Sequence, residues 1–397
     1  MDMFKKSRVY LDYAAATPLS PEAFSAMKPF LTESFANASA IHSEGLKARR
    51  AVEEARGRVA TALQVRPEFV TFTSGGTESN NLAIIGTMEH LFARGLASGR
   101  MEVVTTEIEH PSVMNTMKAL EARGVVVKYV PVDAQGIVLL NVLQELLSEK
   151  TVLFSVAYAN SEIGVVQKVH AIKKALDGAE KKFGTKIMFH LDAAQAPLWL
   201  SCKFDSLNAD LLALDVGKCH GPKGVGILIR SRRALLAPTL FGGGQESGLR
   251  PGTENVAGMV GASVALEAAQ KDFKTRAEKV AKVRDAGIEH LLKEIPSAVL
   301  NGPTGEQRLA NNINISIPGL DTEFATVVLD KHGFAVSTKS ACAGAGGGES
   351  VVVQAISNDP ARASSTLRIS LSPQTTLQNL EDLTKVLKSH IEKMSKI

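Results

Sequence analysis

The sequence has little of several features that mark particular classes of protein. Its 397 residues include only three cysteines, Cys202, Cys219 and Cys342, which cannot all pair in disulfides and whose spacing matches no zinc-binding motif. The first residues lack the apolar core of a signal peptide, and no apolar run reaches the length of a membrane-spanning helix. We therefore expect a reduced, cytoplasmic protein with no membrane association and no metal site.

Charge of one sign is also not concentrated anywhere. Lysine and arginine total 45 against 41 aspartates and glutamates, and they form no basic block, which argues against direct binding of nucleic acid. Hydrophobic residues make up 45% of the chain and charged residues 22%, as in ordinary globular proteins. A chain of this length suits two domains or one large α/β unit.

Apolar strand-like stretches alternate with helical stretches over most of the chain, which predicts a mostly parallel sheet covered by helices on both faces. The expected strands span residues 69–72, 101–106, 125–132, 151–157, 186–192, 211–214 and 225–230, with further strands at 311–317, 335–336 and 364–370. Helical stretches are expected at five places. The first begins at Pro21, the second spans 45–63, the third ends near residue 92, the fourth spans about 256–295 and the fifth begins near residue 377.

One lysine, Lys218, is expected at the end of a buried strand. Apolar residues 211–214 precede it, and glycines at 221 and 224 mark the turn into the next strand. Burial there would lower the pKa of the amine and free it to form a Schiff base. An ordinary turn lysine is the alternative.

The upstream strand over 186–192 ends in Asp192. A Schiff-base lysine and a strand-end aspartate are the pair that pyridoxal 5'-phosphate needs, because the lysine carries the aldehyde and the carboxylate keeps the pyridine nitrogen protonated. Neither residue is specific alone. The pair in this order indicates that cofactor.

A glycine turn after the first expected strand predicts a phosphate site. Gly75 and Gly76 precede Thr77 at the start of a helix, where free backbone N–H groups and the positive helix end attract an anion. A plain helix cap by Ser74 or Thr77 is the alternative. The pair of glycines favours the phosphate site, since a cap needs at most one.

Polar side chains recur at the carboxyl ends of the expected strands, where ligands bind in sheets of this kind. They are Thr77, His110, Asn160, Asp192 and Lys218. His110 can lie flat over an aromatic ring or transfer a proton, although a histidine before a proline is more often a loop residue. Their convergence carries more weight than any single motif.

A second, smaller domain is expected after the glycine-rich loop over 241–255. There Cys342 lies in a loop of small residues, 337–348, that offers no core to bury it, so we expect a mobile, exposed nucleophile rather than a packed side chain. Arg368 lies in an alternating strand and can bind a carboxylate bidentately. A structural ion pair is the alternative for Arg368.

Together these motifs resemble those of the cysteine desulfurases, in the class V aminotransferase group of pyridoxal phosphate enzymes. The resemblance covers essentially the whole chain, and the Cys342 segment separates this family from most class V relatives. The matching segments are 10–14, 72–79, 109–110, 162–167, 192–195, Lys218, 221–226, 242–244, 250–253, 340–342 and Arg368.

The resemblance implies an α/β fold of the aspartate aminotransferase-like type (fold type I), with a mostly parallel sheet in a large domain and a smaller α+β domain. It implies an N-terminal segment at 1–17 that packs with the small domain. A large domain at 18–257 would bind pyridoxal phosphate, and a small C-terminal domain at 258–397 would carry the catalytic cysteine loop.

The resemblance also implies a role for each site residue. Lys218 would hold the cofactor and transfer a proton, and Cys342 would attack the sulfur of bound L-cysteine, taking a persulfide and leaving alanine. Around the cofactor ring, His110 would stack on the ring, Asp192 would bind the pyridine nitrogen and Gln195 the phenolic oxygen. Gly76, Thr77 and a second subunit's Thr253 would bind the phosphate, and Ser161 and Asp215 would contribute elsewhere around the cofactor. Arg368 and Asn37 would bind the substrate carboxylate. The protein would be a homodimer that passes its persulfide to an iron–sulfur scaffold or a tRNA-thiolation relay.

Several positions depart from the family pattern. Residues 215–217, Asp-Val-Gly, stand where the family usually has Ser-x-His before its lysine, and Ser161 stands in place of an asparagine. A carboxylate beside a phosphate is unfavourable unless it is neutralised, so Asp215 is expected either to turn away or to change the affinity for the cofactor. Lys339 replaces a glycine, and its charge would lower the thiol pKa of Cys342 unless it faces water. Ala38 stands where proline is common.

Two other interpretations stay open. One is a selenocysteine lyase, or another β-eliminating pyridoxal phosphate enzyme of the same fold. The other is a non-catalytic scaffold that binds sulfur-carrier partners, which only the unusual residues 215–217 favour.

Overall fold

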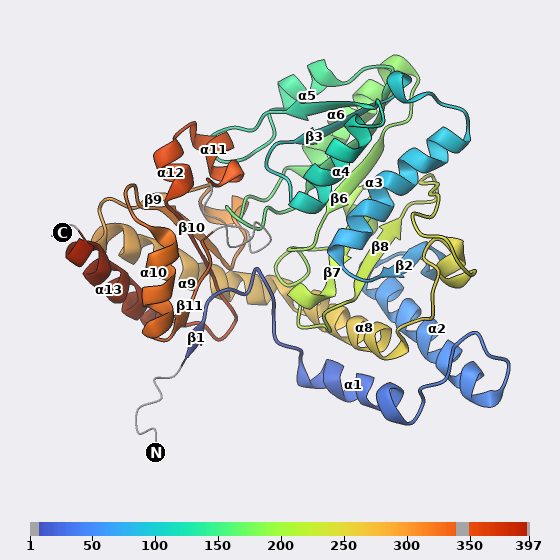
Figure 1. Ribbon diagram of the computed structural model, residues 1–397, viewed down its shortest axis with the longest axis horizontal. Coiled ribbons are helices and arrows are strands. Elements are labelled where there is room, and N and C mark those ends of the chain that lie inside the picture. Colours follow the sequence, from blue (N-terminus) through green and yellow to red (C-terminus); the bar gives the residue numbers. More distant parts are fainter. Residues whose placement is uncertain (1–7, 339–348, 395–397) are drawn as a thin grey trace.

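Seven strands form the central sheet of the computed structural model, which describes residues 8–338 and 349–394 (Figure 1). Their order is β2-β8-β7-β6-β5-β3-β4. They are β2 (Val70–Thr73), β3 (Glu102–Thr106), β4 (Val126–Val130), β5 (Thr151–Ala157), β6 (Met188–Asp192), β7 (Leu211–Asp215) and β8 (Gly226–Arg230). Only β8 is antiparallel to both of its neighbours, whereas the other pairings in the sheet are parallel.

Helices cover both faces of this sheet, as expected from the apolar strands. Neighbouring residues on β3 show the alternation: Val103 packs in a cluster with α3 and α4, and Val104 packs in the larger cluster that includes α6. Both are fully buried, which is why the strands are continuously apolar rather than alternating. The helices are α3 (Gly76–Ala93), α4 (Pro111–Glu121), α5 (Leu140–Leu146), α6 (Val169–Phe183) and α7 (Phe204–Leu207), with α1 (Pro21–Thr32) and α2 (Ser43–Leu63) preceding them.

A smaller unit lies beside the large sheet (Figure 1). Its three-stranded antiparallel sheet has the order β12-β10-β9. Its strands are β9 (Val299–Leu300), β10 (Asn312–Ser316) and β12 (Thr366–Ser370), and its helices are α9 (Phe273–Glu294), α10 (Thr322–Lys331), α11 (Val351–Ser357), α12 (Pro360–Ser364) and α13 (Leu377–Met394). Short 3₁₀ turns are η1 (Pro67–Phe69), η2 (Ser98–Arg100), η3 (Val216–Lys218), η4 (Gln245–Gly248) and η5 (Gly305–Gln307).

The N-terminal segment packs on the smaller unit before the chain crosses to the large one. Strand β1 (Val9–Tyr10) pairs in parallel with β11 (Phe334–Ala335). Further along, the hydroxyl of Thr17 donates a hydrogen bond of 3.0 Å to the carbonyl of Gly217, next to Lys218. The segment therefore ties the small sheet to the turn that carries the lysine.

The helical region expected over 256–295 is present as two helices. The structure has α8 (Val256–Lys271) and α9, separated at Asp272, whose φ of −123° and ψ of 22° are not helical. Helix α8 packs on α1 and α2, while α9 packs on α13. The domain division at 257/258 therefore stays a proposal, and the packing favours a boundary at Asp272 instead.

The remaining expected elements lie within a few residues of the observed ones. For example, β5 has the expected bounds and α2 begins two residues before the expected start. None of the helices in the described ranges combines the length and apolarity needed to cross a membrane.

Candidate active site

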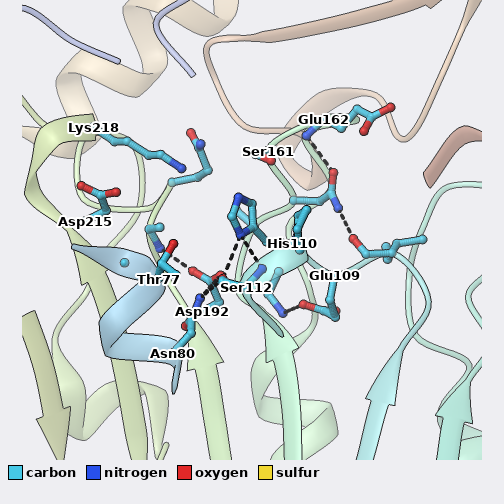
Figure 2. A pocket seen from close by; sticks show the side chains of 18 of the residues that line it. Thr77, Asn80, Glu109, His110, Ser112, Ser161, Glu162, Asp192, Asp215 and Lys218 are labelled. Atoms are coloured by element: carbon cyan, nitrogen blue, oxygen red, sulfur yellow. Dashed lines mark hydrogen bonds between the residues drawn. The ribbon is translucent and has the colours of Figure 1, made fainter. Parts of the chain in front are cut away.

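A cavity of about 200 Å³ lies at the carboxyl ends of the parallel strands (Figure 2). The segments that follow β2, β3, β5, β6 and β7 all contribute to its wall, because parallel strands end at the same edge of a sheet. The expected site residues that line it are Gly76, Thr77, His110, Asn160, Ser161, Asp192, Gln195, Asp215 and Lys218.

Other expected site residues do not line this cavity. Asn37 is exposed on the loop between α1 and α2, where its Oδ1 accepts a hydrogen bond of 2.8 Å from the backbone of Ser39. Thr253 is exposed on the loop before α8. Cys342 and Lys339 lie outside the described residues.

Lys218 ends the 3₁₀ turn η3, directly after β7. Its half-buried side chain extends toward the cavity (Figure 2). Gly221 lets the turn close on itself, since a Cβ there would lie 2.8 Å from the carbonyl oxygen of Val216. The expected strand-end lysine is thus present, and it faces a cavity rather than solvent alone.

Asp192, the last residue of β6, presents a buried carboxylate that is 7% exposed. Oδ1 accepts a hydrogen bond of 3.0 Å from the backbone of Ala194, and Oδ2 accepts one of 2.8 Å from Nδ2 of Asn80. These donors fix the carboxylate against the cavity, where it can bind a cationic group of a ligand. Gln195 is held nearby through a hydrogen bond of 2.9 Å from its Nε2 to the carbonyl of Ala14.

His110 caps the start of α4 with its ring. Its Nδ1 accepts a hydrogen bond of 3.1 Å from the backbone N–H of Ser112 and lies 2.8 Å from the Ser112 hydroxyl. Burial is the main cause that lowers the pKa of His110, and the Asp192 carboxylate opposes this. The ring is therefore an ordered, neutral wall of the cavity rather than a free loop side chain.

The start of α3 has the features expected of an anion site. Gly75, at the N-cap, has a φ of 154°, and no side chain within the described part of the chain caps the helix. The alternative of a plain cap by Ser74 or Thr77 is therefore not observed. The first N–H groups of α3 remain available to a phosphate. Gly76 is closely packed: a Cβ there would lie 3.2 Å from Cβ of Asp215.

Asp215 does not turn away from this site. It lines the cavity beside Gly76 and below Lys218 (Figure 2). Its Oδ1 accepts a hydrogen bond of 3.0 Å from the backbone N–H of Gly217, so the Asp215 side chain caps the start of η3. The carboxylate thus stabilises the lysine turn and at the same time places negative charge next to the start of α3.

Arg368 is buried at 1% exposure on β12. Its Nη2 donates a hydrogen bond of 2.9 Å to Asp12, and its Nη1 donates one of 3.2 Å to the carbonyl of Ser161. The structural ion pair considered from the sequence is therefore present. Because Ser161 lines the cavity, Arg368 lies directly behind the cavity wall.

Glu109 lines the cavity and was named from the sequence only as part of a motif. It is 6% exposed and links the ends of β3 and β5. Its Oε1 accepts a hydrogen bond of 2.5 Å from the hydroxyl of Thr106, the last residue of β3, and its Oε2 accepts one of 2.7 Å from the backbone of Ala157, the last residue of β5. Burial raises the pKa of Glu109 to about 8, and the Asp192 carboxylate adds to this rise.

Sequence reasoning also missed Asn80 and Ser112, which line the cavity. The sequence contained a signal for Asn80. It lies three residues after Thr77 and four after Gly76, a spacing that puts it on the same face of a helix as these two expected site residues. Ser112 gave no such signal. It contacts Asn80 only because α3 and α4 pack together.

The model of the class V aminotransferase family matches residues 9–383. The chain belongs to this family. It is 39% identical over 392 residues to "Cysteine desulfurase IscS" of Dictyoglomus turgidum, a match that covers 99% of this chain and 96% of that protein. The family resemblance inferred from the sequence is thereby confirmed.

Solved structures that are similar to this chain confirm the expected fold. A "NIFS-LIKE PROTEIN" has a TM-score of 0.88 at 33% identity, covering 97% of this chain and 99% of its own. A structure described as "SspA in complex with cysteine" has a TM-score of 0.77 at 34% identity, covering 92% and 99% of the two chains.

We predict that Glu109→Gln changes how stability depends on pH. Because the pKa of Glu109 is higher in the folded chain than in the unfolded one, its contribution to stability is full below about pH 4.5 and is lost as the pH rises through about 8. Glutamine has no such titration. Urea unfolding measures this at pH 5 and pH 8. Between these pH values the free energy of unfolding of wild type should fall by on the order of 2 kcal/mol more than that of the variant.

The matched control is Glu107→Gln, an exposed glutamate on the same loop, which should follow wild type at both pH values. A difference between wild type and Glu109→Gln that does not change with pH would contradict a raised pKa at Glu109.

Proposed function

We propose that this protein is a pyridoxal phosphate-dependent cysteine desulfurase that converts L-cysteine to L-alanine and takes the sulfur onto Cys342 as a persulfide. One observation carries the proposal: Lys218 and Asp192, at the ends of adjacent strands, face one cavity together with His110 (Figure 2). The names of the curated relatives support it, as does a similar structure described in complex with cysteine.

The cavity fits the proposed cofactor. Lys218 would bind its aldehyde, Asp192 its pyridine nitrogen, Gln195 its phenolic oxygen, and the uncapped start of α3 with Gly76 and Thr77 its phosphate. Once bound, pyridoxal phosphate supplies an electron sink for the electrons of a broken Cα–H bond. The Nζ of Lys218 would hold the proton from that bond.

The substrate contacts are supported unequally. Arg368 donates to the carbonyl of Ser161 in the cavity wall and to Asp12, but it does not itself line the cavity, so its role at the substrate carboxylate rests on the resemblance together with this position behind the wall. Asn37 stays a proposal that rests on the resemblance alone, because it is exposed and does not line the cavity.

The nucleophile is proposed by comparing the three cysteines of the sequence. Cys202 and Cys219 are buried, at 0% and 1% exposure, and burial raises the pKa of both thiols. A thiol must ionise and reach its target to attack, so neither is suited to the task. Cys342 is the remaining candidate.

The residues that flank the Cys342 segment support its placement. The backbone of Ser337 exchanges hydrogen bonds with that of Arg368 (3.1 and 2.7 Å), and the hydroxyl of Ser350 donates to Glu162, which lines the cavity. Cys342 follows Ser337 by five positions in the sequence, a reach of at most roughly 17 Å. In the reaction the Cβ–S bond of the substrate breaks and an S–S bond to Cys342 forms, and a reductant or acceptor later removes the sulfur.

We predict that Cys342→Ala keeps cofactor binding but loses formation of alanine and sulfide from cysteine on the order of 100-fold or more, because no thiolate takes the sulfur. Cys202→Ala is the matched control and should retain activity. Cofactor binding is read from the absorption spectrum, and both products are quantified.

Two outcomes of that experiment favour the alternatives. Unchanged turnover of selenocysteine by Cys342→Ala would indicate a selenocysteine lyase, or another β-eliminating enzyme of this fold. Failure of the wild-type protein to bind pyridoxal phosphate would favour the non-catalytic scaffold.

We predict that Asp215→Asn raises the affinity for pyridoxal phosphate about tenfold, about 1.4 kcal/mol, because it removes a negative charge beside the phosphate site. The asparagine still has an Oδ1 to accept from Gly217, so the lysine turn keeps its cap. Fluorescence titration gives the dissociation constants. Pyridoxal, which has no phosphate, serves as the control ligand and should bind both proteins alike; an equal gain for both ligands would contradict this role of Asp215.

The proposal includes a homodimer. Large apolar side chains are exposed on α1 and the loop that follows it, among them Phe24, Phe35 and Ile41 at 53%, 78% and 89%. Phe241, at 92%, lies on the loop that also carries Thr253. Exposed apolar surface of this kind indicates an interface, and a second chain that covered Phe241 would lie against the loop that carries Thr253.

Sedimentation equilibrium at micromolar concentration should therefore give a mass of two chains. Phe35→Asp should weaken the dimer on the order of tenfold or more, since it buries a charge in the interface. Val327→Asp, an exposed position on α10 at 63%, is the control and should leave the dimer intact. A monomeric wild-type protein would contradict the proposed interface.

A cytoplasmic location and delivery of the persulfide to an iron–sulfur scaffold or a thiolation relay complete the proposal. The first rests on the low cysteine content, and the second on the resemblance to the family.

A further inference from the structure

A continuous chain of hydrogen bonds joins His110 to Asp192 through Asn80 and Ser112 (Figure 2). Nδ2 of Asn80 bonds to Oδ2 of Asp192 at 2.8 Å and to Oγ of Ser112 at 2.9 Å. That hydroxyl in turn lies 2.8 Å from Nδ1 of His110. Asn80 and Ser112 are buried, at 1% and 8% exposure, so water does not replace these contacts.

The direction of each hydrogen bond in this chain is fixed. The Asp192 carboxylate only accepts, so it faces the amide nitrogen of Asn80, whose two protons serve Asp192 and Ser112. The Ser112 hydroxyl accepts from Asn80 and has its own proton left to donate to His110. The backbone N–H of Ser112 also donates to the same His110 nitrogen, at 3.1 Å.

Nδ1 of His110 is therefore an acceptor for two donors and carries no proton. A neutral imidazole then has its proton on Nε2. Protonating Nδ1 would set an N–H against the N–H of Ser112 and would require the hydroxyl to turn. The network thus opposes the charged form of the ring and selects one neutral tautomer.

We propose that Asn80 and Ser112 are positioning residues that lock His110 as the neutral Nε2–H tautomer and tie it to the carboxylate of Asp192. The value of this lock rests on the proposed function. A charged His110 would compete with the cofactor's pyridine nitrogen for Asp192, whereas a neutral ring leaves the carboxylate to the cofactor.

Other charged groups act on His110 as well. Asp192 and Asp215 raise its pKa and Lys218 lowers it, while Glu109, the preceding residue, is protonated below about pH 8. All of these remain in a variant at Ser112. A change caused by that variant therefore reports the hydroxyl and not the surrounding charges.

The test is nitrogen NMR of the full chain labelled with ¹⁵N-histidine, both loaded with pyridoxal phosphate and free of it, with His110→Gln to assign the signal. In wild type, His110 should show the Nε2–H tautomer and titrate below an ordinary histidine. Ser112→Ala should raise the pKa of His110 by about 0.5 to 1 unit, the size expected for one lost hydrogen bond. Ser112→Thr keeps the hydroxyl and should restore the wild-type value.

A second variant, Asn80→Ala, removes the donor that orients the hydroxyl and should shift the pKa in the same direction by a smaller amount. It also serves if Ser112→Ala does not fold. Wild-type protein with the Nδ1–H tautomer would overturn the proposal. So would folded variants at both positions that leave the tautomer and the pKa unchanged.

The cofactor-free measurement separates this inference from the proposed function. An intact lock in a protein without desulfurase activity would contradict the function alone. An active enzyme in which neither variant changes the tautomer or the pKa of His110 would contradict the lock alone.

Discussion

The parallel pairing of β5, β6 and β7 is the constraint on which the site depends. In this register Ala157 lies opposite Asp192, and Asp192 lies opposite Ala213, so these strands end at one edge and their following loops share one cavity. Glu109 reinforces that edge by joining the end of β3 to the end of β5. A shift in strand register would move Asp192 and Lys218 apart along with the strands that carry them.

The second feature of the site is how it accommodates negative charge in a small buried space. Asp192 receives two donors, from Ala194 and Asn80, and Asp215 receives one from Gly217. Glu109 instead has its pKa raised by burial. All three carboxyl groups accept hydrogen bonds, but only at Glu109 does burial outweigh them and raise the pKa.

The sequence was sufficient to predict the large sheet and the residues at its strand ends, because both follow from local patterns. Apolar runs predict the strands, and parallel topology alone brings Thr77, His110, Asp192 and Lys218 together. The break at Asp272 has no glycine or proline to mark it, so the sequence did not predict where the helical region over 256–295 divides into two helices. The contacts of Arg368 with Asp12 and of Asn80 with Ser112 depend on how distant elements pack, which no local pattern encodes.

One measurement on the wild-type protein tests the central claim most directly. The absorption spectrum is recorded with pyridoxal phosphate, and then L-cysteine and a reductant are added while alanine and sulfide are quantified. The account predicts the visible band of lysine-bound cofactor, followed by alanine and sulfide in equal amounts. A protein that shows no band even with added cofactor, or one that shows the band but forms no alanine, would contradict it.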